Sequence, residues 1–71
     1  MPNEKKIKAR ILELGLTIKA LADEMGLSAY TLGQKISGKA PMTLKEAIYL
    51  KERLNIPDEE VVAYFFIRRV A

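Results

Sequence analysis

Apolar residues recur along this chain at intervals of three and four positions, the spacing that gives an α-helix one hydrophobic face. Sustained alternation of apolar and polar residues, which marks a half-buried strand, does not occur, and no internal repeat is visible. The pattern predicts five helices, at about Asn3–Leu14, Ile18–Met25, Ser28–Ser37, Thr43–Leu54 and from Pro57 onward. Because the connections are short, we expect the helices to pack as a compact all-α bundle.

Residues that stabilise free backbone groups mark the ends of these helices. Thr17, Ser28 and Thr43 precede three of them, and each hydroxyl can accept a hydrogen bond from a first-turn N–H group. With Glu46 three residues later, Thr43 begins a capping box. Glycine adopts the left-handed conformation that ends a helix at little cost. Such glycines follow the first three helices at Gly15, Gly26 and Gly38.

The apolar face of each helix predicts the core. Phe65 and Phe66 are adjacent and cannot both point into one face, so we expect one in the core and one exposed, where it would suit a dimer contact. The other side chains predicted to face inward are Ile7, Ile11, Leu14, Leu44, Ala47, Ile48 and Leu54, with Leu16–Leu21 and Leu27–Leu32 as hydrophobic staples.

Composition narrows the function. The 71 residues make a single small domain, 1–71, near the lower size limit for one apolar core. There is no cysteine for a disulfide or thiolate metal site and no histidine, the commonest general base, so we expect no enzyme, cofactor or small-molecule ligand. No apolar run approaches the ~18 residues that cross a bilayer, and Met1–Arg10 is polar, so we expect a cytoplasmic protein without membrane contact.

The charge is unevenly distributed. The net charge is only +3, but Leu27–Lys45 contains Lys35, Lys39 and Lys45 and no acidic residue. The acidic residues gather elsewhere, for example in Asp58–Glu60. A basic face of this kind favours nucleic acid as the partner.

Two predicted helices joined by a short turn, the second of them polar and basic, are typical of a DNA-binding helix-turn-helix, here at about residues 17–37. Ala22 is small where the two helices must approach each other. Gly26, four residues later, falls in the turn, and Leu32, six residues further on, returns to the core.

The segment LTIKALADEMGLSAYTLGQKISGK, Leu16 to Lys39, resembles the phage-repressor helix-turn-helix family of Cro-like and repressor-like regulators. The similarity extends to the preceding helix and to NIPDEEVVAYFF, Asn55–Phe66. It implies a five-helix lambda-repressor-like bundle that regulates transcription. A Cro-like repressor of this kind would bind a palindromic double-stranded DNA operator as a homodimer, with the third helix in the major groove, inside a bacterial cell or phage-infected host.

The resemblance also implies a set of contact residues. Gln34 can bind adenine through two hydrogen bonds and Ala29 suits a thymine methyl group, while Tyr30 could meet a methyl group or a phosphate. The residues expected to read bases are Ala29, Tyr30, Gly33 and Gln34. Those expected to contact phosphates are Thr17, Lys19, Ser28, Thr31, Lys35, Ser37, Lys39 and Lys45.

Three positions depart from the family pattern. Ile18 replaces the usual glutamine at the start of the second helix, so its phosphate contact is lost or passes to a neighbour. Lys35 replaces an apolar residue, with Ile36 packing inward instead. Gly33 interrupts the third helix, at a cost of about 1 kcal/mol, either to let DNA backbone approach or because it is simply tolerated.

Other interpretations remain for these residues. Tyr30 can be a core or plain surface aromatic, and Lys35 and Lys39 can belong to a solvated face. Arg10 can reach a phosphate, whereas Arg68–Arg69 is typical of the charged end of a fraying helix. The alternative function is a protein-interaction module on the same fold, such as an antirepressor or antitoxin-like partner, whose binding would be insensitive to salt.

Overall fold

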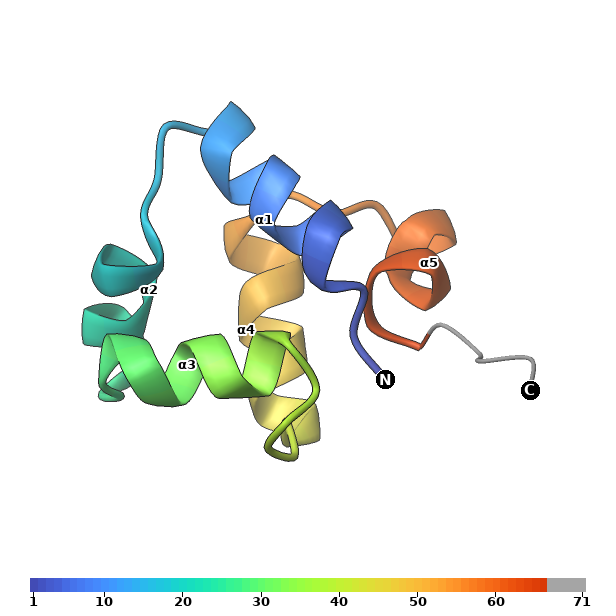
Figure 1. Cartoon of the computed structure of the whole chain (residues 1–71). Helices are drawn as coiled ribbons and strands as arrows, with labels where there is room; N and C mark the ends of the chain where they lie inside the picture. The colour runs from blue at the N-terminus through green and yellow to red at the C-terminus, as the bar shows by residue number, and fades with distance from the viewer. Residues whose placement is uncertain (67–71) are drawn as a thin grey trace.

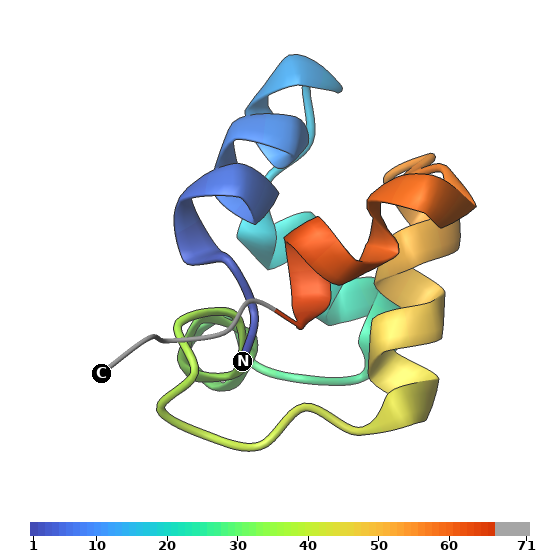
Figure 2. The same cartoon turned by 90° about the vertical axis from the view of Figure 1, so that its right-hand side faces the viewer.

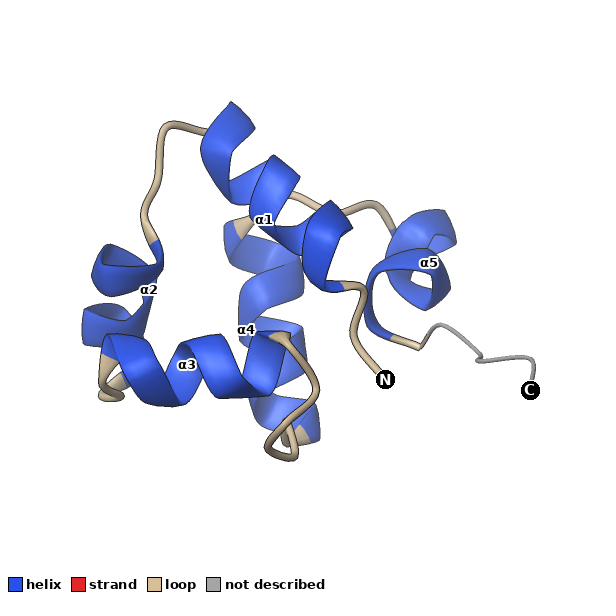
Figure 3. Cartoon of the chain, viewed as in Figure 1, coloured by secondary structure: helices blue, strands red, loops and turns tan. Residues whose placement is uncertain are grey.

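The computed structural model describes residues 1–66, and within that range it is entirely helical (Figures 1 and 3). This confirms the predicted all-α bundle. The elements are α1 (Glu4–Glu13), α2 (Ile18–Met25), α3 (Ala29–Ile36), α4 (Leu44–Arg53), a 3-10 turn η1 (Asp58–Glu60) and α5 (Val61–Phe65). None of the helices in the described range is long and apolar enough to cross a membrane.

Helices α2, α3 and α4 begin where the predicted capping residues lie. Thr17, Ser28 and Thr43 each accept a hydrogen bond from the backbone N–H three residues on, and Thr43 forms the full capping box with Glu46. Asn3 caps α1 in the same way. Each such cap stabilises its helix by about 1 kcal/mol. The glycines expected at helix ends all have positive φ, at Gly15, Gly26 and Gly38.

The fifth helix begins later than the sequence suggests. The acidic segment after Pro57 forms the 3-10 turn, and α-helical geometry starts only at Val61. Pro57 offers no side-chain cap, and Glu60 has φ −105° and ψ −2°, which interrupts the regular helix. One of the two adjacent phenylalanines is buried and the other exposed, as predicted: Phe65 lies in the core and Phe66 is 53% exposed. Arg68–Arg69 lies outside the described residues.

The core lies where the helices converge. In Figure 1, α2 and α5 stand on opposite sides, and Figure 2 shows α5 closing the side between α1 and α4. Each fully buried large side chain contributes about 1.5–3 kcal/mol by leaving water. The buried residues are Ile7, Ile11, Leu21, Ala22, Leu32, Ile36, Leu50, Leu54, Ile56, Tyr64 and Phe65, with Leu14, Leu16, Leu27 and Ala47 packed against them.

One part of the core prediction was wrong. Leu44 and Ile48 were expected to face inward, but they are 71% and 47% exposed. The inward stripe of α4 instead follows Ala47, Leu50 and Leu54, which are three and four residues apart. Leu44 and Ile48 lie on the flank of that stripe, where they border a shallow hollow beside α5.

Polar side chains join helices that are distant in sequence. The Arg10 guanidinium donates to the carbonyl of Leu54 at 2.8 Å, so it caps the C-terminus of α4 rather than projecting toward a ligand. Glu24 of α2 accepts hydrogen bonds from Arg53, at 3.0 and 3.2 Å, and from the Tyr49 hydroxyl, both on α4. The hydrogen bonds from Arg53 and then Tyr49 lower the pKa of Glu24 below its ordinary value of 4.5.

This carboxylate should make the stability of the protein sensitive to acid. Since its pKa is lowered in the folded state, Glu24 stabilises the fold above about pH 4.5, and that contribution is lost as the pH falls through the folded-state pKa. Glu24→Gln should therefore be less stable than wild type at neutral pH, and the difference should shrink as the pH falls below 4.5. Urea unfolding across this range measures the difference. Glu52→Gln, an exposed position on α4, is the control and should keep the wild-type pH profile.

Candidate nucleic-acid interface

Helices α2 and α3 pack as the two arms of a helix-turn-helix. Ala22 and Leu32 are fully buried between them, and Gly26 ends α2 with φ 72°. The backbone N–H of Leu27 donates to the carbonyl of Ala22 at 2.9 Å, which fixes the turn. A residue with a side chain would be strained at the φ of Gly26, so the predicted spacing of Ala22, Gly26 and Leu32 has its physical explanation here.

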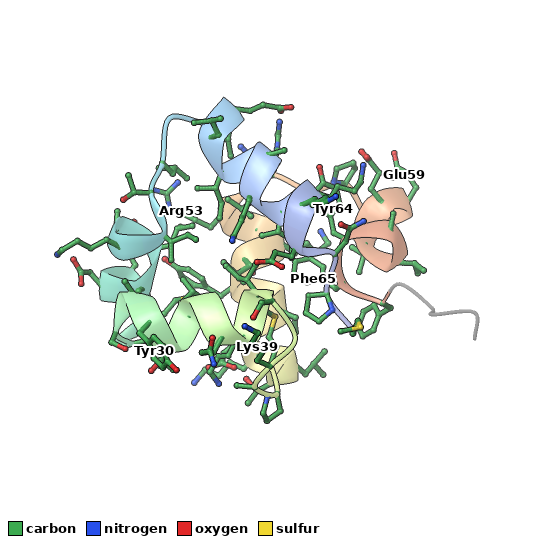
Figure 4. All side chains as sticks on the ribbon, viewed as in Figure 1. Tyr30, Lys39, Arg53, Glu59, Tyr64 and Phe65 are labelled. Atoms are coloured by element: carbon green, nitrogen blue, oxygen red, sulfur yellow. The ribbon has the colours of Figure 1, made fainter. Side chains whose placement is uncertain are left out.

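The first turn of α3 points away from the core. Tyr30 is 75% exposed and projects from the N-terminal end of α3 (Figure 4), so its interpretation as a core aromatic was wrong. Ala29 beside it is also exposed. The Ser28 hydroxyl accepts from the Thr31 N–H at 3.0 Å and donates to the Thr31 hydroxyl at 2.9 Å. Ser28 has therefore used its proton, whereas the Thr31 hydroxyl still has one to donate.

One turn later, Gly33 and Gln34 are half-buried. The side-chain amide of Gln34 makes no hydrogen bond with any described residue, so both its donor and its acceptor are available. A Cβ at Gly33 would meet no atom within 4 Å, which shows that packing within this chain does not require the glycine. Either a partner that approaches α3 closely requires Gly33, or the residue is merely tolerated.

The predicted basic face is smaller than the sequence suggests, because Lys35 is not free. Its ammonium donates to Glu46 at 3.0 Å and to the carbonyl of Pro41 at 3.2 Å, and its side chain is only 15% exposed. This predicted phosphate contact is thus a half-buried lysine that is paired within the chain, and not part of a solvated face. Burial acts to raise the pKa of Glu46. Hydrogen bonds from Thr43 and Lys35 outweigh this effect, so the pKa lies below its ordinary value.

The other lysines remain at the surface. Lys39 lies past the C-terminal end of α3 (Figure 4) and Lys45 in the first turn of α4; both are exposed and have no ion pair within residues 1–66. Lys19 lies 3.5 Å from Asp23, and both side chains are well exposed. Such a contact is weak and can be exchanged for a phosphate.

The two remaining predicted residues are caps. Thr17 accepts from the Ala20 N–H at 3.0 Å and keeps its own proton for a partner. Ser37 donates to the carbonyl of Gln34 at 3.1 Å and is engaged within the chain. Ile18, one of the three departures from the family pattern, is half-buried against the core and carries no polar group.

The site therefore has two parts. Within α3, Ala29 and Tyr30 are exposed and the half-buried Gln34 adds its free amide. Cations and hydroxyls are supplied by Thr31 of α3 and by residues before and after this helix, namely Thr17, Lys19, Lys39 and Lys45. Sequence reasoning missed that Glu46 would hold Lys35, because the capping box locates Glu46 but not a second partner. It also missed the link from Glu24 to Tyr49 and Arg53. No cluster of metal-binding side chains occurs among the residues that the structure describes.

No protein-family model, no curated protein and no solved structure matches this chain. The interpretation of the site therefore depends on its residues and their geometry, together with the motif in the sequence.

Gly33 provides a direct test of this geometry. Gly33→Ala should stabilise the protein by about 0.5–1 kcal/mol, since alanine favours the helix and the added Cβ meets nothing. Urea unfolding measures the change. Gly26→Ala is the contrasting variant: at φ 72° the substitution should destabilise the protein. A loss of stability in Gly33→Ala would mean that α3 is packed differently.

Proposed function

We propose that this protein is a sequence-specific double-stranded DNA-binding regulator of transcription, of the Cro-like repressor kind, with α3 in the major groove of a palindromic operator. One observation carries the proposal: the exposed face of a helix-turn-helix presents Tyr30 and the unpaired Gln34 amide, with lysines that lack ion-pair partners on its flank. Such a regulator acts where its DNA is, in the cytoplasm of a bacterial or phage-infected cell.

Base recognition would come from neutral side chains. The Gln34 amide can donate to N7 and accept from N6 of adenine when presented edge-on, a pairing worth about 1–3 kcal/mol of discrimination. Ala29 is small and apolar, which suits contact with a thymine methyl group. Tyr30 is exposed enough to lie against a base or to donate its hydroxyl to a phosphate.

Phosphate contacts would come from the flanks. Lys39, Lys45 and, after exchange of its weak pair, Lys19 are the cations of this surface, and the Thr17 and Thr31 hydroxyls are neutral donors. Three neutralised phosphates give a salt slope of about −3 per protomer. This is a modest electrostatic contribution, so we expect useful affinity only when two protomers bind adjacent half-sites.

The surface for the second protomer would be the apolar flank of α4 and α5. Leu44, Ile48 and Phe66 are 71%, 47% and 53% exposed and line one shallow hollow with Ala47 and Val61. Grouped apolar side chains of this kind favour a protein contact, and a homodimer would cover them in both copies.

The same apolar flank, with Lys35 withdrawn from the basic face, favours the second candidate function. In that case the fold is a protein-interaction module, antirepressor or antitoxin-like, and the flank binds a different protein. Binding to DNA and its salt dependence separate the two candidates.

Selection from a randomised duplex pool, followed by fluorescence anisotropy at two salt concentrations, tests the function. Wild type should select a palindrome, and its binding should weaken steeply as the salt concentration rises. Gln34→Ala should lose about five- to 150-fold of the discrimination at one A·T pair. Leu12→Ala, exposed on α1, is the control and should bind as wild type. Failure of wild type to bind any duplex at low salt would exclude DNA binding and favour the interaction module.

The dimer surface has a separate test. Ile48→Glu places a charge on the apolar flank without entering the core, so it should shift the protein toward monomer and weaken binding to a full palindrome more than to a half-site. Sedimentation velocity over a concentration series measures the first effect. Leu12→Glu substitutes a more exposed apolar residue away from this flank and should leave association unchanged. Wild type that remains monomeric both free and on the palindrome would contradict the homodimer.

A further inference from the structure

Besides the backbone hydrogen bonds from Lys39 and Ala40 to the Gln34 carbonyl, one carboxylate holds the α3–α4 connection. Glu46, in the first turn of α4, accepts from the Thr43 N–H at 2.8 Å and from the Lys35 ammonium at 3.0 Å. Lys35 in turn donates to the carbonyl of Pro41 at 3.2 Å. A single half-buried cluster thus joins the last turn of α3, the middle of the connection and the start of α4.

This cluster links the elements that carry the two sets of proposed DNA contacts. Tyr30 and Gln34 belong to α3, whereas Lys39 lies in the connection and Lys45 in α4. Side chains that read bases and cations that meet phosphates must keep one relative placement if both are to contact the same duplex, since an error of about 1 Å weakens hydrogen bonds steeply.

We propose that Lys35 and Glu46 are positioning residues for DNA recognition, whose ion pair fixes α3 relative to the α3–α4 connection and the start of α4. Lys35 then serves the interface without touching DNA. The inference rests on the proposed function, because it assigns these residues a part in the same recognition.

Burial and charge favour this role over a direct phosphate contact. The two side chains are 15% and 18% exposed, which distinguishes the pair from surface ion pairs of little energetic value. To reach a phosphate, Lys35 would have to leave both acceptors and expose an uncompensated carboxylate beside the DNA. Paired, it neutralises Glu46, the carboxylate that borders the acid-free stretch Leu27–Lys45.

Glu46→Gln distinguishes the two roles because they predict opposite results. Glutamine can still complete the capping box, so the start of α4 is retained while the ion pair is lost. For a positioning pair, the ratio of affinities for the selected palindrome and a random duplex should fall about fivefold or more, with no steeper salt slope. For a direct phosphate contact, the released Lys35 should bind the palindrome more tightly, with a slope steeper by about one.

Glu52→Gln is the matched control: it makes the same chemical and charge change at an exposed position of the same helix, and should keep the wild-type ratio. Circular dichroism verifies that each variant is folded at the assay temperature. Should Glu46→Gln fail to fold, Lys35→Met provides the test. If Lys35→Met lowers the ratio of affinities for palindrome and random duplex at an unchanged salt slope, the positioning role is supported. A salt slope shallower by about one overturns that role.

The outcomes separate the two proposals. If wild type selects no DNA, the proposed function fails and the positioning role falls with it. If wild type selects a palindrome but Glu46→Gln keeps the full ratio or binds more tightly, only the positioning role is overturned.

Discussion

The length of the helices is the constraint on which the rest of this structure depends. The longest of them, α1 and α4, have ten residues each, whereas isolated helices shorter than about 12–15 residues are marginal in water. Each helix is therefore stable only through the shared core and through what secures its ends. This explains why the polar residues of so small a chain are largely engaged in structure: four side chains cap helix starts, and Arg10 caps the end of α4.

The same constraint shapes the candidate interface. Near the helix-turn-helix, Ser28, Ser37 and Lys35 use their donor groups within the chain, whereas Gln34 and Lys39 keep theirs available. Thr17 does both, because it caps α2 as an acceptor and keeps its own proton. Residue type does not distinguish these groups, since each contains residues that can bind DNA. Only the hydrogen-bond partners divide them, and the division reduces the proposed contacts to a neutral reading face with cations on its flank.

Features that depend on near neighbours could be predicted from the sequence. The caps at Thr17, Ser28 and Thr43 follow from hydrogen bonds to backbone N–H groups only three residues away. The turn at Gly26 follows because glycine adopts a positive φ at little cost. Features set by distant neighbours could be predicted only in part, as for the core positions Ile7, Ile11 and Leu54. The inward face of α4 was misjudged because Leu44 and Ile48 form a second apolar flank, and the placement of the other helices decides which stripe is buried.

The basic face shows the same limit. Lys35 and Glu46 are 11 residues apart and meet only because the α3–α4 connection returns the chain on itself, so counting lysines in an acid-free stretch overestimates the free charge.

The pairing of Lys35 also affects how the proposed interface would recognise DNA. Lys35 is the charged residue of α3, and its pairing leaves the helix proposed to read bases electrostatically neutral on its exposed face. A base-contacting helix without net charge adds little to the sequence-independent attraction between phosphates and cations. In the proposed complex, attraction then comes from the flanking lysines and discrimination from α3, so the two can change independently. A protein arranged in this way gains selectivity by keeping its nonspecific affinity low rather than by binding tightly.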